Sequence, residues 1–427
     1  MELTRETLHA LVTKSGLWID PQHTFVLSPD VFTVSRADAD ALGSFAVALH
    51  DCLGGIGRIA AIATMPTLIN GAAWKKIGRT LGTGIPTRYA SVQHRRPSGV
   101  PGICKVDFMI DTEGQWRIAE IDGHNKHGLG YSTVAAQVRD AIGYGGSMFP
   151  GVVDALVRQI ERRNDPRLAI VYADQERFYE PELRILARAL AARGIGVTLF
   201  REEEARVVDG AVFVRDMPVP ARLYLDLPFM HHNQPLIDAL FIGAASGEID
   251  FLIPPKPFLG SKAVLAFLRN DEEDPEIEAI LRSQIFARSL DLVRSYIPRT
   301  FFIETVEPDA RWRRELNGTP YVVKETISYG MKGTIFRDDD GLEDALREAK
   351  RSPRQYVVQE EVVNRPFSFR SFRDDGSITT DGWFTRVTVH FGIRAVADII
   401  VTARKDKKVH GATDCLQLGC VISENGG

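Results

Sequence analysis

The chain has 427 residues, of which 44% are hydrophobic and 25% charged, and its formal net charge at pH 7 is −4. It is long enough to bury the cores of two or three subdomains, and without a basic block it predicts no nucleic-acid partner. We find neither an apolar leader nor an apolar run of membrane-spanning length, so we expect no membrane partner.

The first hundred residues predict helices and loops rather than a site. Ser35 is typical of a helix start, and the apolar residues after it follow helical spacing. We expect Gly54 and Gly55 to interrupt or end this helix. Residues 66–100 are rich in Gly, Pro and Arg, so we expect loops there with one helix around 72–79.

Residues 103–121 alternate polar and apolar side chains on both sides of a turn, which predicts a β-hairpin. Glu120 and Asp122 come two residues apart at its end, so both side chains should point to the same face. Such a pair suits Mg²⁺ that bridges nucleotide phosphates, because this ion needs few protein ligands. Two surface carboxylates at a turn are the alternative interpretation.

A glycine-spaced polar loop with His124 and His127 follows, and a helix is expected from Ser132. The two histidines beside the carboxylates raise the alternative of a transition-metal site. We do not favour that alternative, because such metals normally need ligands on fixed elements.

Residues 167–201 predict a β-α-β unit. A buried-type strand at 168–172 precedes an amphipathic helix at 180–193 and a second strand at 197–200. Residues 211–215 and 222–227 predict further strands. The unit implies a parallel sheet.

Residues 321–336 predict a second hairpin, with Lys324 at the end of its first strand and a polar turn with two glycines. Glycines allow backbone N–H groups to approach phosphate oxygens, so the hairpin could cover a triphosphate. Ordinary hairpin-turn chemistry explains the same glycines. A second lysine, Lys262, is predicted in a helical stretch after a proline-led segment.

The strand predicted at 356–363 is apolar until it reaches Gln359 and Glu360. The backbone that leaves such a strand can present N–H and C=O groups to adenine, although an exposed strand end is the alternative. Later strands are predicted at 386–390, 397–403 and 418–422.

Three basic residues near the later strands could hold a transferred phosphate or a substrate carboxylate: Arg386, Arg394 and Arg404. The four cysteines lack CxxC spacing, so we expect no disulfide framework or zinc site, and a reducing cytoplasm is the simplest location. The chain contains no Walker A loop, GxGxxG fingerprint, GxSxG elbow or kinase HRD set.

Taken in order, these stretches resemble the circularly permuted ATP-grasp proteins, the group that contains eukaryotic-type glutathione synthetase and glutathionylspermidine synthetase. The resemblance is carried by residues 105–109 with 117–122, 168–200, 254–263, 321–336 and 357–362, and by the glycine-rich strand pair at 410–421. Their shared order and compatible separations matter more than any one motif.

The resemblance implies a mixed α/β and α+β architecture, a permuted ATP-grasp fold with an inserted β-α-β substrate-binding subdomain of the pre-ATP-grasp type. We expect an N-terminal part of the core with the magnesium segment at 1–165, the β-α-β subdomain at 166–260, and the nucleotide-binding and phosphate-covering part at 261–427. The implied activity is an ATP- and Mg²⁺-dependent carboxylate–amine ligation through an acyl phosphate.

When the site residues of the family are carried over by position, the resemblance implies that Glu120 and Asp122 bind Mg²⁺. It also implies that Lys105 and Arg404 contact the reacting groups. Lys105 would also bind the substrate, together with Asn125 and His127. The expected ATP-binding residues are Lys262, Lys324, Ser328, Tyr329, Gly330, Met331, Lys332, Gly333, Gln359, Glu360 and Val362.

The chain departs from the family pattern at several positions. Asp122 stands where the family usually has Asn, and an aspartate there should still bind metal. Lys105 stands where the family has Arg, and a lysine loses the bidentate recognition of a carboxylate. A third metal ligand found in some members is missing, although Glu325 is nearby. Asn125 and His127 stand where one branch has the serines that hold glutathione, so we do not expect glutathione as the substrate.

Two other functions stay open. The chain could be an ATP-grasp phosphotransferase that leaves a phosphate on its acceptor, or a non-catalytic nucleotide-binding module. For a ligase, the expected partners are a small carboxylic acid, such as an amino acid or peptide, and an amine. Proteins with this fold are often dimers, so a homodimer is one expectation for the oligomeric state.

Overall fold

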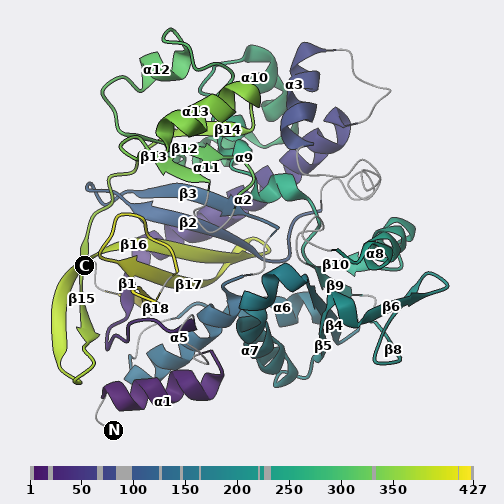
Figure 1. The fold of residues 1–427 in the computed structure, drawn as a ribbon, viewed down its shortest axis with the longest axis vertical. Coiled ribbons are helices and arrows are strands. Elements are labelled where there is room, and N and C mark those ends of the chain that lie inside the picture. The colour runs from purple at the N-terminus through teal and green to yellow at the C-terminus, as the bar shows by residue number, and fades with distance from the viewer. Residues whose placement is uncertain are drawn as a thin grey trace.

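The computed structural model describes residues 4–17, 23–64, 71–82, 99–124, 127–144, 148–162, 165–219, 222–225, 232–328, 333–411 and 413–424. Within these ranges the chain forms four β-sheets with helices packed on and between them (Figure 1). In the view of Figure 1, the largest sheet crosses the middle, an antiparallel sheet lies above it, and a parallel sheet lies at lower right.

The largest sheet takes strands from both halves of the chain. Its strands are β1 (Phe32–Ser35), β2 (Cys104–Ile110), β3 (Trp116–Asp122), β15 (Phe367–Phe372), β16 (Ile378–Gly392), β17 (Ala395–Arg404) and β18 (Leu416–Ser423). The order is β1–β18–β17–β16–β2–β3, and β15 pairs with the N-terminal part of β16, outside this order. The β1–β18 pair is parallel and the others are antiparallel. The predicted hairpin at 103–121 is therefore confirmed as β2 and β3.

One face of this sheet packs against α2 (Arg36–Ala63), which Ser35 caps as predicted. The prediction that Gly54 and Gly55 interrupt or end this helix is wrong, because α2 continues without a break to Ala63. A Cβ atom on Gly55 would lie 2.3 Å from Ile285 Cγ1, so the glycine permits close packing against the residue that follows α10 (Pro275–Gln284). Among the described helices, α2 alone is long and apolar enough to cross a membrane, and 72% of its most apolar stretch is buried inside the molecule.

The β-α-β prediction is also confirmed. Strands β4 (Arg167–Tyr172) and β5 (Gly196–Arg201) are parallel and are joined through α7 (Glu180–Ala191). Strands β9 (Arg222–Leu225) and β10 (Asp250–Phe251) complete the sheet in the order β10–β9–β4–β5.

The strand predicted at 211–215 does not join the parallel sheet. It forms β7 of a separate antiparallel sheet, whose strands are β6 (Ala205–Val208), β7 (Ala211–Val214) and β8 (Met217–Pro218). The reason is local: Asp209 and Gly210 have φ values of 50° and 80°, and Arg215 and Asp216 have values of 50° and 62°. Two successive residues with positive φ make a tight hairpin turn, so each strand pairs with its neighbour in sequence.

The fourth sheet carries the predicted nucleotide segments. Its order is β11–β14–β12–β13, all antiparallel, with strands β11 (Thr300–Phe302), β12 (Tyr321–Glu325), β13 (Thr334–Phe336) and β14 (Tyr356–Glu360). The hairpin at 321–336 is confirmed as β12 and β13, whereas the strand predicted at 356–363 ends at Glu360.

The remaining helices cover these sheets. They are α1 (Arg5–Ser15), α3 (Ala72–Leu81), α5 (Leu129–Ile142), α6 (Val152–Glu161), α8 (Gln234–Ser246), α9 (Ala263–Arg269), α10 (Pro275–Gln284), α11 (Ala287–Tyr296), α12 (Arg311–Glu315) and α13 (Leu342–Arg351), with 3₁₀ turns η3 (Asp174–Tyr179), η4 (Glu202–Glu204) and η6 (Pro257–Gly260). The helix predicted from Ser132 begins three residues earlier, at Leu129.

Candidate functional site

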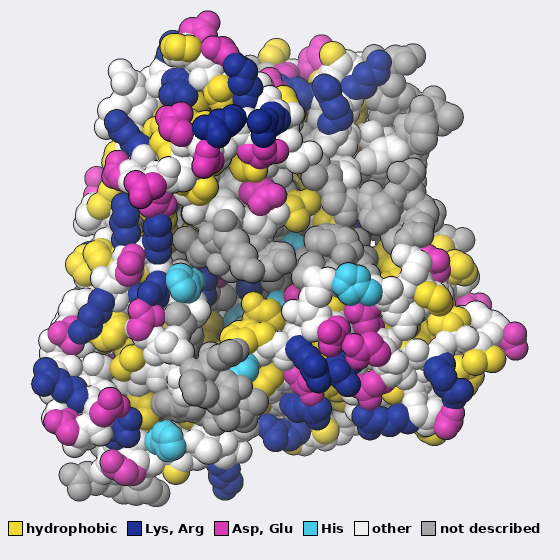
Figure 2. All heavy atoms as spheres, viewed as in Figure 1, with side chains coloured by type: hydrophobic (Ala, Val, Ile, Leu, Met, Phe, Trp, Pro, Cys, Tyr) yellow, Lys and Arg dark blue, Asp and Glu magenta, His cyan; other side chains and the backbone are white. Residues whose placement is uncertain are grey.

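A cavity of about 350 Å³ lies where the largest sheet, the four-stranded antiparallel sheet and the η3–α7 segment meet. Strands β2, β3, β16 and β17 supply its polar residues from one side, and β12 and β14 supply the other side. On the face drawn in Figure 2, the surface is hollowed between the upper and lower parts of the molecule, and histidine side chains lie around the hollow.

The predicted metal pair, Glu120 and Asp122, lines this cavity. Asp122 Oδ2 lies 3.1 Å from Lys105 Nζ, and Asp122 Oδ1 lies 3.1 Å from His124 Nδ1. Burial opposes ionisation of Asp122, but the charge of Lys105 and the hydrogen bond of His124 together hold the pKa of its carboxyl well below the usual range. Asp122 is therefore a carboxylate at neutral pH.

A β-bulge shapes the end of β3. Asp107 pairs with Glu120, but the next residue of β2, Phe108, pairs with Ile118, so Ala119 is the extra residue. The carbonyl oxygen of Ala119 accepts a hydrogen bond from Lys324 Nζ at 3.0 Å. The bulge thus links the carboxylate strand to the predicted phosphate-binding lysine.

The two predicted phosphate lysines both reach the cavity, and both are buried. Lys262 is the N-cap residue before α9, and its Nζ donates to Glu120 Oε1 at 3.0 Å and to the carbonyl of Ser328 at 3.1 Å. Lys324 Nζ donates to two neutral oxygens, from Ala119 and Gln359. Burial and the neighbouring charge of Lys262 lower the pKa of Lys324 to about 8.

The predicted phosphate loop is described only at its two ends. Tyr329, Gly330, Met331 and Lys332 lie outside the described residues. Ser328 lines the cavity, and a Cβ atom on Gly333 would lie 2.7 Å from its hydroxyl, so the loop ends approach closely. Glu325 is exposed and is not among the cavity residues, so its position does not suit a third metal ligand.

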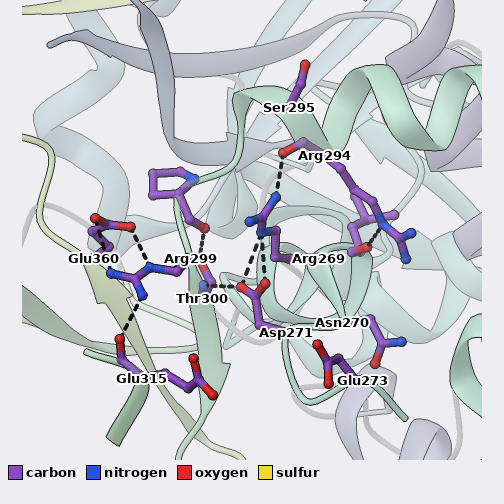
Figure 3. Close-up of polar contacts among 12 residues, drawn as sticks. Arg269, Asn270, Asp271, Glu273, Arg294, Ser295, Arg299, Thr300, Glu315 and Glu360 are labelled. Carbon is purple, nitrogen blue, oxygen red and sulfur yellow. Dashed lines mark hydrogen bonds and ion pairs between the residues drawn. The ribbon is translucent and has the colours of Figure 1, made fainter. Parts of the chain in front are cut away.

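The predicted adenine segment also borders the cavity, through Gln359, Glu360 and Val362. The Glu360 side chain is turned toward Arg299, whose Nε donates to Glu360 Oε2 at 3.0 Å (Figure 3). Figure 3 also shows Asp271 accepting the Thr300 N–H, at 2.7 Å. The ion pair of Glu360 thus holds the end of β14, and the hydrogen bond of Thr300 holds the start of β11, which pairs with it.

Lys105 lines the cavity, and its role in binding a substrate carboxylate stays a prediction. Burial disfavours its charge, yet Asp122, Asp107 and Glu120 hold the pKa of Lys105 above its usual value. Asp107 accepts a hydrogen bond from Thr388 Oγ1 at 2.6 Å. Lys105 therefore stays charged beside three carboxylates.

The position of Arg404 does not support the role predicted for it. Arg404 is not among the cavity residues, because at the end of β17 its guanidinium turns to Asp414 at 2.6 Å and to His410 Nε2 at 2.8 Å. Arg386 on β16 lines the cavity instead, and its Nε lies 3.7 Å from Asp107 Oδ2 but makes no hydrogen bond in the described part of the chain. Arg394 pairs with Asp51 elsewhere.

The other end of the cavity was only partly predicted. His127 is buried there, with Nε2 2.7 Å from Glu176 Oε2, and its ring stacks on Tyr179 with centroids 3.5 Å apart. Asn125 lies outside the described residues. The sequence indicated neither Glu176 nor Tyr179, because η3 is a 3₁₀ helix of only six residues, too short to show a periodicity of its own.

We compared the chain with known proteins to identify its fold. No family model and no curated protein matches the chain. Solved structures do match, and the likeness to a glutathione synthetase-like effector shows that the chain has an ATP-grasp-like fold, as predicted. The permuted order within that fold stays a prediction.

One such structure is a glutathione synthetase-like effector from Globodera pallida in its apo form. It aligns over 99% of this chain and 98% of its own, with a TM-score of 0.53 and 11% sequence identity. A putative gamma-glutamylcysteine synthetase from Methylobacillus flagellatus aligns over 92% and 90%, with a TM-score of 0.43 and 12% identity. D-alanyl-alanine synthetase A from Vibrio cholerae aligns over 57% and 68%, with a TM-score of 0.31 and 11% identity. At such identity the likeness concerns the fold alone.

Proposed function

We propose that this protein is an ATP- and Mg²⁺-dependent ligase that joins a carboxylic acid to an amine through an acyl phosphate. The observation that carries the proposal is the convergence of two carboxylates, two buried lysines and two further basic residues on one cavity. Its members are Glu120, Asp122, Lys262, Lys324, Lys105 and Arg386.

The carboxylate pair fits Mg²⁺ better than a transition metal. No group of three or more metal-ligating side chains occurs in the described ranges, so Glu120 and Asp122 would be the protein ligands. Asp122 lines the cavity with its carboxylate, and a cation there would compete with His124 Nδ1, which lies 3.1 Å from Asp122 Oδ1. Mg²⁺ accepts few protein ligands because phosphate oxygens and water complete its shell, and it neutralises charge on the reacting phosphates.

The lysines suit the nucleotide phosphates. Lys324 is a buried ammonium whose described acceptors, Ala119 O and Gln359 Oε1, are both neutral, so its charge is available to an anion. Lys262 forms an ion pair with Glu120, one of the two proposed metal ligands. The loop ends at Ser328 and Gly333 would bring the covering segment over the triphosphate. Water exclusion by that segment would protect an acyl phosphate from hydrolysis.

The acid substrate would bind with its carboxylate toward Lys105 and Arg386. Both side chains reach the cavity from adjacent strands, and Arg386 Nε, which lies 3.7 Å from Asp107 Oδ2, makes no hydrogen bond in the described part of the chain. Two cations there would stabilise negative charge between the carboxylate and the transferred phosphoryl group. The amine would approach from the end lined by Glu176, whose carboxylate favours a cationic group.

ADP release in the presence of Mg-ATP tests this proposal, with a panel of amino acids, small peptides and amines added singly and in pairs. A ligase needs one acid and one amine together. A stable phosphorylated product without an amide would show a phosphotransferase, and ATP binding without ADP release for any pair would favour a non-catalytic module.

Replacement of Lys324 by methionine provides a control within the site. We expect Lys324→Met to lower ADP release by at least about 100-fold, since a charge that contacts the reacting phosphates is lost. The fold should persist, because methionine has a similar length and removes a buried charge. Lys350→Met, on the exposed face of α13, is the matched control and should keep both activity and melting temperature. Equal activity of the two variants would contradict the role of Lys324.

A further inference from the structure

The side chain of Gln359 faces a lysine rather than open space in the cavity. Gln359 lies on β14 and is only 2% exposed. Its Oε1 accepts a hydrogen bond from Lys324 Nζ at 2.7 Å, and its Nε2 donates to Thr300 Oγ1 at 3.1 Å. Both polar ends of the amide are therefore occupied by protein groups.

The hydrogen-bond chain fixes which way the amide points. Thr300 Oγ1 donates its hydrogen to the carbonyl of Pro298 at 2.8 Å, so toward Gln359 it acts as an acceptor. The Gln359 group beside it must then be the NH₂ group, which turns Oε1 toward Lys324. Thr300 is itself held through its N–H by Asp271 Oδ2 at 2.7 Å.

This arrangement leaves Lys324 fixed in place but not neutralised. The ammonium has three hydrogens, and Gln359 and Ala119 take two of them. No carboxylate in the described ranges lies within ion-pair distance of Lys324 Nζ, whereas Lys262 has Glu120 at 3.0 Å. A glutamine at 359 therefore orients the lysine without cancelling its charge, which a glutamate of the same shape would do.

We propose that Gln359 is a positioning residue, which holds Lys324 toward the phosphates of the nucleotide and does not contact the base. The inference rests on the proposed function and corrects the expectation that Gln359 meets adenine. Base contacts are then left to the backbone beyond Gln359 and to Glu360 and Val362, which also border the cavity.

Three probes separate the two roles: Mg-ATP, magnesium tripolyphosphate, which has no base, and adenosine, which has no phosphate. Binding of each is measured by calorimetry for the wild type and for Gln359→Leu. We expect Gln359→Leu to weaken Mg-ATP and tripolyphosphate by a similar factor, about ten-fold, as for loss of a hydrogen bond to a charged group. Adenosine binding should stay within about two-fold.

A charge series sharpens the test. Gln359→Glu keeps the shape but places a carboxylate against Lys324, so it should weaken tripolyphosphate at least as much as Gln359→Leu does. Thr300→Val removes the acceptor that fixes the amide and should weaken tripolyphosphate, whereas Thr300→Ser retains the hydroxyl and should restore wild-type affinity. If circular dichroism shows that Gln359→Leu fails to fold, Thr300→Val and Thr300→Ser still test the inference.

Weaker adenosine binding with unchanged tripolyphosphate binding would overturn the inference and return Gln359 to the base. Unchanged affinities in folded Gln359→Leu and Thr300→Val would overturn it as well. If the wild type binds neither Mg-ATP nor tripolyphosphate, the proposed function itself fails, and this inference fails with it.

Discussion

Arg386 and Arg404 lie on neighbouring strands of the largest sheet, but of the two only Arg386 reaches the cavity. Arg386 is paired in register with Thr402, a cavity residue, and Arg404 lies two residues further along β17. There Asp414 and the carbonyl of Lys408 hold its guanidinium. Arg386 lies inside β16, whereas Arg404 is the last residue of β17 and turns toward the residues that follow this strand.

We therefore expect Arg386→Ala to lower ligation by roughly 100-fold or more, as for loss of one group that stabilises transition-state charge. Arg404→Ala removes a partly exposed ion pair and should keep activity within a few-fold. Steady-state ADP release for both variants provides the comparison. A larger loss in Arg404→Ala than in Arg386→Ala would restore the prediction made from the sequence.

Because the pKa of Lys324 is lowered to about 8, we expect this side chain to take up a proton when the nucleotide binds. The groups that face Lys324 are Lys262, Glu120 and Asp107, and burial together with Lys262 lowers its pKa to about 8. At pH 8 about half of the Lys324 side chains are neutral in the free protein, and a triphosphate favours the charged form. Mg-ATP binding should then take up about half a proton at pH 8, and affinity should fall as pH rises through 8.

Calorimetry of Mg-ATP binding at pH 8, in buffers of different ionisation heat, measures this uptake. Lys324→Met should abolish it. Proton release, or an uptake that survives in Lys324→Met, would contradict the assignment of the proton to this lysine.

At the scale of elements, α2 shows how the same residue type has two roles. Gly55 faces the segment after α10, where a Cβ atom would lie 2.3 Å from Ile285 Cγ1 and 2.9 Å from the carbonyl oxygen of Gln284. Gly43, on the same helix, has nothing within 4 Å of its Cβ position. Neither glycine ends α2, because the low helix propensity of a single glycine costs only about 1 kcal/mol and the rest of the helix is well packed.

This difference makes a matched pair of variants. We expect Gly55→Ala to lower the free energy of unfolding by about 1–3 kcal/mol through overpacking. Gly43→Ala should raise it by about 0.5–1 kcal/mol, because alanine is the better helix former. Urea unfolding of both variants measures the two values. Equal and favourable effects would show that Gly55 is not a packing position.

The elements that could be predicted are those with local signals. The hairpins β2–β3 and β12–β13 and the β4–α7–β5 unit each have a turn or periodicity of their own. The strand β15 was missed, since it lies beside a proline and its pairing with β16 is tertiary information. Glu120, Asp122, Lys262 and Lys324 reach one cavity as expected, whereas Glu176 and Tyr179 on η3 had no signal to follow.

At the scale of the whole molecule, the cavity exists because one sheet combines both ends of the chain. The carboxylate strand β3 lies at the edge of that sheet, and Arg386 comes from β16, more than 250 residues later. The lysines arrive from the four-stranded sheet and from α9. No part of the chain alone contains the metal, phosphate and acid groups, so the proposed chemistry depends on this assembly.

The central claim is that the protein activates a carboxylate by phosphorylation, and oxygen transfer tests it most directly. The acid that supports ADP release with an amine is labelled with ¹⁸O in its carboxylate, and the inorganic phosphate formed with Mg-ATP is analysed by mass spectrometry. We expect one ¹⁸O atom per phosphate released, because the carboxylate oxygen that attacks the γ-phosphorus leaves with the phosphate. Unlabelled phosphate, or label that appears in AMP, would contradict it.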